Sequence, residues 1–200
     1  MSEQKFVNKI NVDELMETIG RVRQNPELGR SCFRVKNRWL EGGHNETSIQ
    51  GFYIAGQEDD SRDEPFVLEA DEPPVLLGEN RGPNPVEYLL TALAGCLTSS
   101  MVYHAAAHGI HIEELESEVE GEIDLRGFLG IEKEVKKGYQ NIHVNFKVRS
   151  DASPEKLREL ALFSPVFDTI TSPVPVMVHV EKKEPVSKNW ESKPAEAGVL

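Results

Sequence analysis

The stretch that decides the fold is NPVEYLLTALAGCLTSSM, residues 84–101. It opens with helix-starting residues, because Asn84 is a good N-cap and Pro85 suits the first helical position. Glu87, two positions further on, can bond back to the amide of the cap, as in a capping box. Gly109 is the next helix-ending signal, about seven turns later. The pattern therefore predicts one long helix.

One face of this helix gathers small residues around a cysteine. Its members are Leu89, Ala92, Leu93, Cys96, Ser99, Ser100 and Tyr103. Residues as small as Ala92, Ala94 and Gly95 allow another backbone to approach closely. We therefore expect a buried packing helix that contacts a partner helix.

The first half of the chain reads as one helix followed by three strands. Apolar residues recur at helical spacing over 12–22, which indicates an amphipathic N-terminal helix. Strand-like runs follow at 32–40 and 47–55, separated by the hairpin signal EGGHN at 41–45. A third short strand is expected at 66–70.

The second half alternates more regularly. Apolar and charged residues interleave over 118–125 and again over 142–149, as in strands with one wet face. Ser153 and Pro154 then start a helix, and valines at every second position over 174–180 predict a last strand. The element order indicates an α+β fold in which helices cover antiparallel sheets.

Composition narrows the function. The 200 residues are 38% apolar and carry a formal net charge of -12, with a pI near 5.0. This charge argues against nucleic acid as a partner, and we expect no membrane span and a cytoplasmic protein. The expected organisation is an N-terminal helical extension over 1–30, one domain over 31–182 and a polar flexible tail over 183–200.

Cys96 allows two interpretations. A free cysteine is often a small buried hydrophobe with a packing role. A reactive thiol instead needs a cation or a helix N-terminus that favours the thiolate. Cys96 lies about 18 Å along the helix from Asn84, at about 1.5 Å per residue, which is too far for the helix dipole to act. Any activating charge must come from elsewhere in the fold.

The stretches 84–101, 104–127 and 164–180 resemble the OsmC/Ohr family of osmotically inducible and organic hydroperoxide resistance proteins. The resemblance implies an intertwined α+β homodimer, with two central helices back to back and active sites at the subunit interface. It also implies a thiol peroxidase without a cofactor. Cys96 falls on the position that attacks the peroxide and becomes a sulfenic acid.

This chain departs from the family pattern at three places. Ser164 stands before Pro165 where the family has its resolving cysteine, so an external thiol reductant is expected. Val86 follows Asn-Pro where the family has a glutamate, and Glu87 is displaced by one residue. His44 stands where the family has the arginine that stabilises the thiolate. The replacement candidates for that cation are Arg34, Arg38 and Arg81.

The remaining reactive side chains suggest little chemistry. Cys32 can resolve Cys96 only if their Cα atoms lie within about 7 Å. His104, His108 and His111 have a spacing that can chelate zinc, but histidines at a helix end also simply favour the dipole and solvent. We therefore expect no metal.

Two functions follow. The first is reduction of organic hydroperoxides through Cys96 with an external thiol, with His44, Arg34 or Arg38 as candidate thiolate stabilisers and Glu87 as a weaker candidate. The alternative is a non-catalytic dimer that binds an apolar small ligand or senses redox state. The reactivity of the Cys96 thiol separates the two.

Overall fold

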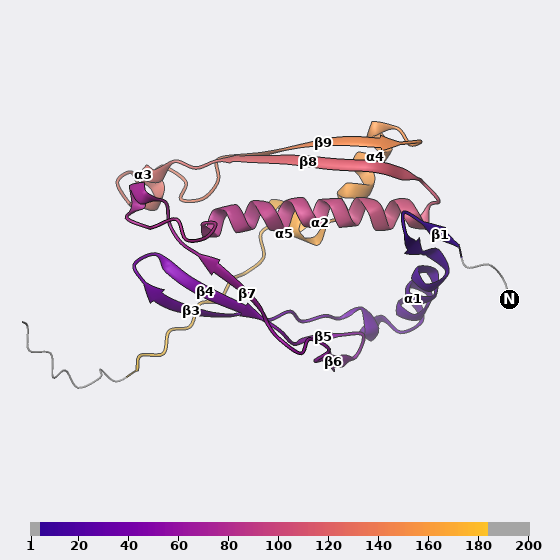
Figure 1. Ribbon diagram of the computed structural model, residues 1–200, viewed down its shortest axis with the longest axis horizontal. Coiled ribbons are helices and arrows are strands. Elements are labelled where there is room, and N and C mark those ends of the chain that lie inside the picture. Colours follow the sequence, from indigo (N-terminus) through magenta and orange to yellow (C-terminus); the bar gives the residue numbers. More distant parts are fainter. Residues whose placement is uncertain (1–4, 184–200) are drawn as a thin grey trace, which may run out of the picture.

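The computed structural model describes residues 5–183. Its longest element is helix α2, Pro85–Ala107, which lies between the two main sheets in Figure 1. The predicted capping box is confirmed: Asn84 Oδ1 accepts the amide of Glu87 at 2.9 Å, and Glu87 Oε2 accepts the amide of Asn84 at 2.8 Å. Gly109 ends the helical turn with a φ of 70°, a conformation that glycine adopts without strain.

The face of α2 that the chain buries differs from the prediction. Its buried residues are Leu93, Leu97, Met101, Ala105 and Ala106. The predicted face is mostly open in the single chain, with Ala92 and Ser99 exposed and Cys96 half-buried. The large side chains at every fourth position make the more apolar stripe, so this stripe faces the core, whereas the small-residue face has no covering element within residues 5–183.

Helix α2 is also long and apolar enough to cross a membrane, by length and composition alone. A core helix of a soluble protein meets the same test. Because one stripe of α2 packs in the core of this chain, the observation is weak evidence for a membrane span.

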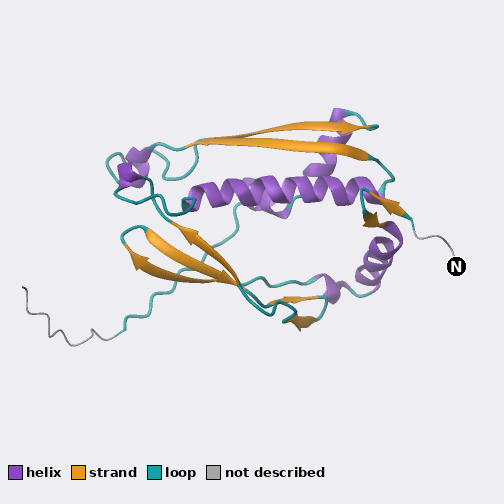
Figure 2. Ribbon diagram, viewed as in Figure 1, coloured by secondary structure: helices purple, strands orange, loops and turns teal. Residues whose placement is uncertain are grey.

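The first sheet is a two-stranded antiparallel ladder of β8, Ile112–Glu122, and β9, Asn141–Ser150. Its half-buried residues alternate with exposed ones, as predicted, and they pack against the core stripe of α2. The alternation predicted through residue 125 stops earlier, because Asp124 caps the short helix α3, Leu125–Phe128. Figure 2 shows the ladder running along the length of α2.

Two short helices complete this core. Helix α4, Pro154–Ala161, starts at the predicted cap, Ser153, and buries Leu157, Leu160 and Ala161 against α2. Helix α5, Pro165–Thr171, begins at the cap residue Ser164 and packs on α2 as well.

The second sheet has the order β3, Lys36–Glu41, then β4, His44–Ile49, then β7, Phe66–Ala70. The predicted hairpin signal is confirmed, because the chain turns at Gly42 and Gly43 between β3 and β4. The predicted strand over 47–55 is strand at both ends but is not continuous: it breaks at Gln50, whose carbonyl accepts Arg62 Nη1 at 2.8 Å. Beyond the break, β5, Phe52–Ile54, pairs with β6, Gln57–Asp59.

The N-terminal part holds the predicted helix and a hairpin that was not predicted. Helix α1, Val12–Gln24, starts at the cap residue Asn11 and is followed by the 3-10 turn η1, Pro26–Gly29. Before it, β1, Phe6–Val7, pairs with β2, Ile10–Asn11. The two residues that join them both have positive φ, which is typical of a tight hairpin turn.

The predicted last strand over 174–180 is wrong for the single chain. These residues form no strand, and the side chains of Val174, Val176, Val178 and Val180 are 57–84% exposed. A strand exists only when another strand bonds to its backbone, and none of residues 5–183 does so here. Nearly all of the predicted tail over 183–200, including Trp190, lies outside the described residues.

Candidate functional site

Cys96 lies in the middle of α2, next to the buried Leu97. Cys96 is half-buried, and among residues 5–183 its thiol makes no hydrogen bond and no disulfide. One turn later, Ser99 Oγ donates to the carbonyl of Gly95 at 2.9 Å, which keeps that hydroxyl occupied by the helix backbone. The thiol is therefore held at the edge of the core without a polar partner in the described part of the chain.

The surface next to Cys96 is formed by small side chains and is exposed. A methyl group added at Gly95 would meet no atom within 4 Å, apart from the helix itself. Ala92 and Ser99, on the same side, are small and exposed. This side of α2 can therefore accept a second body at short range.

The two arginines predicted as thiolate stabilisers have other partners. Arg34 makes two 2.8 Å bonds to the carboxylate of Glu58, and Arg38 pairs with Glu46 at 3.3 Å. The hydrogen bond from Arg34 lowers the pKa of Glu58 below its usual value. Neither arginine contacts Cys96 among the described residues.

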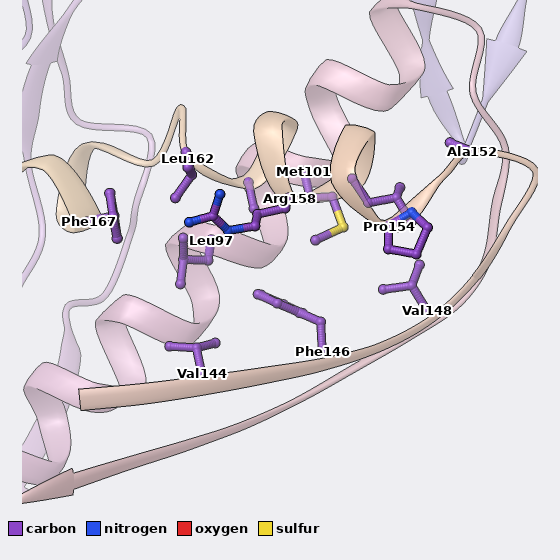
Figure 3. Close-up of a pocket in the computed structure, with 12 residues that line it drawn as sticks. Leu97, Met101, Val144, Phe146, Val148, Ala152, Pro154, Arg158, Leu162 and Phe167 are labelled. Carbon is purple, nitrogen blue, oxygen red and sulfur yellow. The ribbon is translucent and has the colours of Figure 1, made fainter. Parts of the chain in front are cut away.

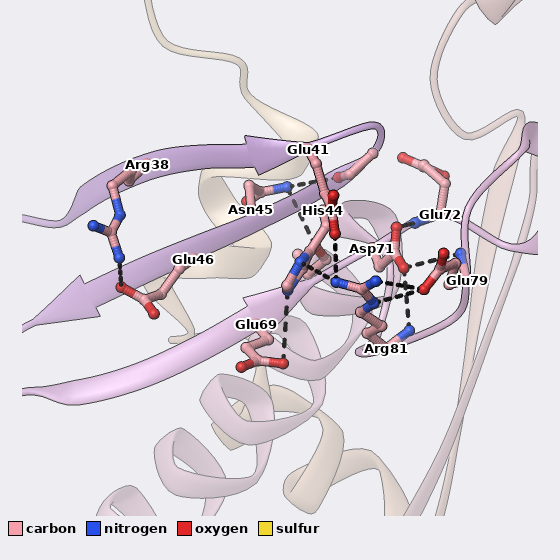
Figure 4. A network of polar contacts seen from close by, with 12 residues as sticks. Arg38, Glu41, His44, Asn45, Glu46, Glu69, Asp71, Glu72, Glu79 and Arg81 are labelled. Atoms are coloured by element: carbon pink, nitrogen blue, oxygen red, sulfur yellow. Dashed lines mark hydrogen bonds and ion pairs between the residues drawn. The ribbon is translucent and has the colours of Figure 1, made fainter.

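His44 is buried and belongs to a polar network at the turn between β3 and β4, which Figure 4 shows. Its Nδ1 lies 3.2 Å from Nη1 of Arg81. Because a guanidinium group only donates, Nδ1 is the acceptor, and the ring carries its proton on Nε2. This nitrogen has no hydrogen-bond partner among the described residues, and the nearest carboxylate oxygen, Glu69 Oε2, is 3.7 Å away.

Arg81 carries the positive charge of this network. It bonds to Glu41 at 2.8 Å and to Glu79 through both Nε and Nη2. These hydrogen bonds raise the pKa of Arg81 above its usual value, and the bond that Arg81 donates to Glu79 contributes most. The two carboxylates outnumber the one guanidinium group, so these three side chains together carry a net negative charge.

Asp71 shapes the loop that brings Arg81 to His44. It is 2% exposed and accepts the amides of Glu72 at 2.8 Å, Glu79 at 3.0 Å and Arg81 at 3.2 Å. Burial alone would raise its pKa, but these three amides outweigh burial, and the net pKa lies below the usual value. The loop therefore depends on an ionised carboxylate at its centre.

This network and Cys96 do not meet within the single chain. No hydrogen bond or ion pair joins them among residues 5–183. The small cavity at the network, about 170 Å³, is lined by Gly43, Gly78 and Leu77 beside the charged groups, and by no thiol. The single chain therefore separates the candidate nucleophile from the candidate cations.

Glu87 and Ser164 have structural partners. Glu87 closes the capping box of α2 and so is used at the start of the helix, one residue after Val86. Ser164, which stands where the family has its resolving cysteine, is fully buried and accepts the amide of Phe167 at 3.1 Å as the cap of α5. Cys32 is exposed and is a free thiol beside Tyr53, to which its backbone is bonded.

The histidines at the end of α2 form no cluster suited to a metal ion within the described residues. His104 stacks on Phe163, with ring centroids 4.1 Å apart. His108 Nδ1 lies 2.7 Å from the carbonyl of His104, so that nitrogen donates to the helix backbone. Burial, followed by the neighbouring His108, lowers the pKa of His104 below 6.5.

Sequence reasoning missed an apolar cavity of about 400 Å³ on the core side of α2. It is lined by Leu97, Met101, Val144, Phe146, Val148, Ala152, Pro154, Leu157, Arg158, Ala161, Leu162 and Phe167. Figure 3 shows these side chains converging from α2, β9 and α4. The helical spacing of the apolar residues in α4 was enough to predict which of them face the core. The gap they leave depends on how three elements meet, which no local pattern encodes.

The comparisons with known proteins give a family and a fold. The family model described as OsmC-like protein matches residues 78–179, just over half of the chain. No curated protein gives a match.

Solved structures with this fold include an OsmC-like protein from Mycoplasma pneumoniae, 20% identical, with a TM-score of 0.50, covering 70% of this chain and 88% of that one. An OsmC-like protein of unknown function from Vibrio cholerae is 12% identical, with a TM-score of 0.51, and covers 68% of this chain and 92% of that one. At a TM-score of 0.46, an organic hydroperoxide resistance protein from Legionella pneumophila is 19% identical over 70% of this chain and 89% of that one.

The matched region contains all of α2 with Cys96, the β8–β9 ladder, and α4 and α5, which are the elements that build the core. The two structural matches with a TM-score of 0.50 or more share this α+β arrangement of antiparallel sheets and a long helix. This chain is therefore a member of the OsmC-like protein family.

Proposed function

We propose that the protein reduces organic hydroperoxides through Cys96 and regenerates the thiol with an external thiol reductant. The observation that carries the proposal is the position of Cys96: a half-buried thiol without a hydrogen-bond partner in the described chain, in the middle of the family's central helix. A thiol in the closed core would be out of reach of a substrate, and this one lies at the border of an open face.

The chemistry needs one cysteine only. The thiolate of Cys96 attacks one peroxide oxygen, the O–O bond breaks, and the alkoxide takes a proton to leave as an alcohol. The sulfenic acid then condenses with an external thiol, releasing water and leaving a mixed disulfide. A second external thiol releases the protein thiol and departs as a disulfide. Because Ser164 is buried as a helix cap, this external route replaces an internal one.

The proposal includes a homodimer that packs on the small-residue face of α2. This face is open at Gly95, and the single chain supplies no cation to Cys96 among residues 5–183. A thiolate at neutral pH requires a nearby positive charge, and a second copy of the chain is the source that a homodimer offers.

Substitution at Gly95 tests the dimer. At Gly95→Leu the added Cβ meets no atom of residues 5–183 within 4 Å apart from the helix itself, and the change replaces a poor helix former with a good one. It should therefore leave the fold intact and lower the dimer fraction in sedimentation velocity. Gly20→Leu, at a second helical glycine with no atom within 4 Å, is the matched control. An unchanged dimer in Gly95→Leu would refute packing through this face.

The peroxidase proposal is tested by the loss of one sulfur atom. Cys96→Ser should abolish consumption of cumene hydroperoxide in the presence of a dithiol, and Cys32→Ser, which removes the other free thiol, should retain it. Mass spectrometry after a peroxide pulse should find a sulfenic acid on Cys96, and the alkylation rate of Cys96 should already be high at neutral pH. Equal peroxide consumption by Cys96→Ser and the unmodified chain would overturn the proposal.

A second function, binding of an apolar small ligand, is favoured by the cavity of about 400 Å³ on the opposite side of α2. This volume is within the range of small-molecule sites, which are mostly apolar with a few polar groups. Here the apolar lining comes from β9 and α4 as well as α2. Equilibrium binding of a fluorescent apolar probe, displaced by alkyl compounds, tests this function independently of Cys96.

A further inference from the structure

The apolar cavity between α2, β9 and α4 has one charged residue in its described lining. Arg158 projects from α4 at the exposed rim, and Figure 3 shows its guanidinium group extending toward Leu97 and Leu162. It makes no hydrogen bond or ion pair through its side chain with any of residues 5–183. An arginine held at an apolar rim offers several N–H donors to an incoming group.

The surrounding charges make this cation distinctive. The chain as a whole carries a net charge of -12, yet no acidic side chain among the described residues lines the cavity. On the same helix, Lys156 is held by Glu159 at 3.0 Å. The cavity therefore presents a cation with spare donors in a strongly acidic protein, and that combination is complementary to an anion.

The interior of the cavity suits an alkyl chain. Met101, Phe146 and Val148 supply aliphatic and aromatic surface away from the rim. Met101 is 1% exposed and unbranched, so it can adjust to the shape of a flexible occupant. Each methylene group that leaves water for such a surface is favourable by about 0.8 kcal/mol, or about a fourfold gain in affinity.

We propose that this cavity binds an amphipathic monoanion, an alkyl carboxylate, with its carboxylate on Arg158 and its chain between Phe146 and Met101. The inference rests on the second function proposed above and adds the chemistry of the head group. It does not involve Cys96, which is absent from the lining.

Titration calorimetry on the full chain tests the head group with ligands of equal chain length. Decanoate should bind, decanol should bind about five- to tenfold more weakly, and decylamine should bind more weakly still, because a charge-assisted bond at a partly exposed rim is worth about that factor. Arg158→Ala should weaken decanoate about five- to tenfold and leave decanol unchanged. Arg158→Lys should recover most of the decanoate affinity.

The control variants separate this site from general charge effects. Lys156→Ala removes the same charge from the same helix but lies outside the cavity lining, so its affinity for decanoate should be unchanged. Ala152→Phe places a ring in the cavity and should remove binding of both decanoate and decanol. Thermal unfolding of each variant establishes that the fold is intact.

The outcomes are distinguishable. Equal affinity for decanoate and decanol in the unmodified chain would overturn the carboxylate inference and leave apolar-ligand binding standing. No binding of either compound would overturn both. Binding that survives Ala152→Phe would place the ligand elsewhere, and an equal loss in Lys156→Ala and Arg158→Ala would reduce the effect to net charge.

Discussion

Truncation of Leu160 to alanine should be among the most damaging changes in the core. Leu160 lies on α4 with no exposed surface and belongs to the cluster that joins α4 to α2. Helix α4 packs more extensively on α2 than α5 does. The side chain of Leu160 therefore helps to hold the helix that carries Cys96.

The expected cost follows from the burial of Leu160. The substitution removes three carbon atoms from the core, which is about 2.4 kcal/mol at about 0.8 kcal/mol for each buried carbon. The hole left behind adds to this, because a closely packed surrounding relaxes only in part, and measured Leu→Ala costs rise to about 5 kcal/mol. We expect Leu160→Ala to lower the free energy of unfolding by about 3 to 4 kcal/mol.

Leu157 gives the comparison that tests the reasoning. It is nearly as buried, at 6% exposed, but it lines the cavity of about 400 Å³. A side chain next to empty space makes fewer van der Waals contacts, so fewer are lost on truncation. Leu157→Ala should therefore lower the free energy of unfolding by about 2 kcal/mol, at the low end for such changes. Leu162 lies on the rim and is 37% exposed. Because its side chain is only partly removed from water, Leu162→Ala should lower the free energy of unfolding by less than about 1 kcal/mol.

The assay is urea unfolding followed by far-ultraviolet circular dichroism. All variants must be compared at one protein concentration, because any association of the folded chain shifts its apparent stability. The reasoning is refuted if Leu157→Ala costs as much as Leu160→Ala, since the cavity would then be filled or closed in solution.

Three further changes test local features. Gly78→Ala would place a methyl group 1.8 Å from the carbonyl oxygen of Glu72, so it should distort the loop before α2 and lower the unfolding midpoint. Asn84→Ala removes the cap of α2 and should cost about 1 kcal/mol, whereas Asn84→Ser should cost little. Because the pKa of His104 is lowered on folding, its stability contribution is complete above pH 6.5 and is lost as the pH falls through the lowered value. His104→Phe, which keeps an aromatic ring on Phe163, should flatten this slope in urea midpoints measured from pH 7.5 to about 5.

Local signals in the sequence predicted the three longest helices, α1, α2 and α4, and the two long strands β8 and β9. The cap and the first turn of α2 contain their own bonding partners, because Asn84 and Glu87 bond to each other's backbone amides. The β8–β9 ladder was predictable for a similar reason, since the alternation of apolar and polar residues along one strand indicates which face is exposed to solvent. These features depend on residues close in sequence or on a period.

Features that depend on distant partners were not predictable. The role of Asp71 arises because a loop returns three backbone amides to one carboxylate, and no pattern marks those donors. The valines over 174–180 do have a strand period, but within residues 5–183 no backbone pairs with them. Periodicity shows what a segment can form, and the presence of a partner decides whether it does.

The candidate site was predicted in parts rather than as a whole. Cys96 and His44 were identified from the resemblance, and Arg81 was one of three replacement cations. The hydrogen bond from Arg81 to His44 Nδ1 could not be predicted from the sequence. The two residues are 37 positions apart, and only the folding of β7 and its following loop brings them together. Because Nδ1 of His44 accepts this hydrogen bond, the positive charge of the pair lies on Arg81 and not on the imidazole ring.

Three features of the single chain are incomplete in a related way. The small-residue face of α2 beside Cys96 is uncovered, the apolar segment over 174–180 has no strand partner, and Cys96 lacks a cation among the described residues. Exposed apolar surface favours burial in proportion to its area, and a segment with strand periodicity can pair with an open sheet edge such as that of β9. One second copy of the chain can supply a helix face, a sheet edge and a basic side chain together, whereas without it each of the three features needs a separate partner. If this reasoning holds, Gly95→Leu should lower both the dimer fraction and peroxide reduction by Cys96, and the matched control Gly20→Leu should lower neither.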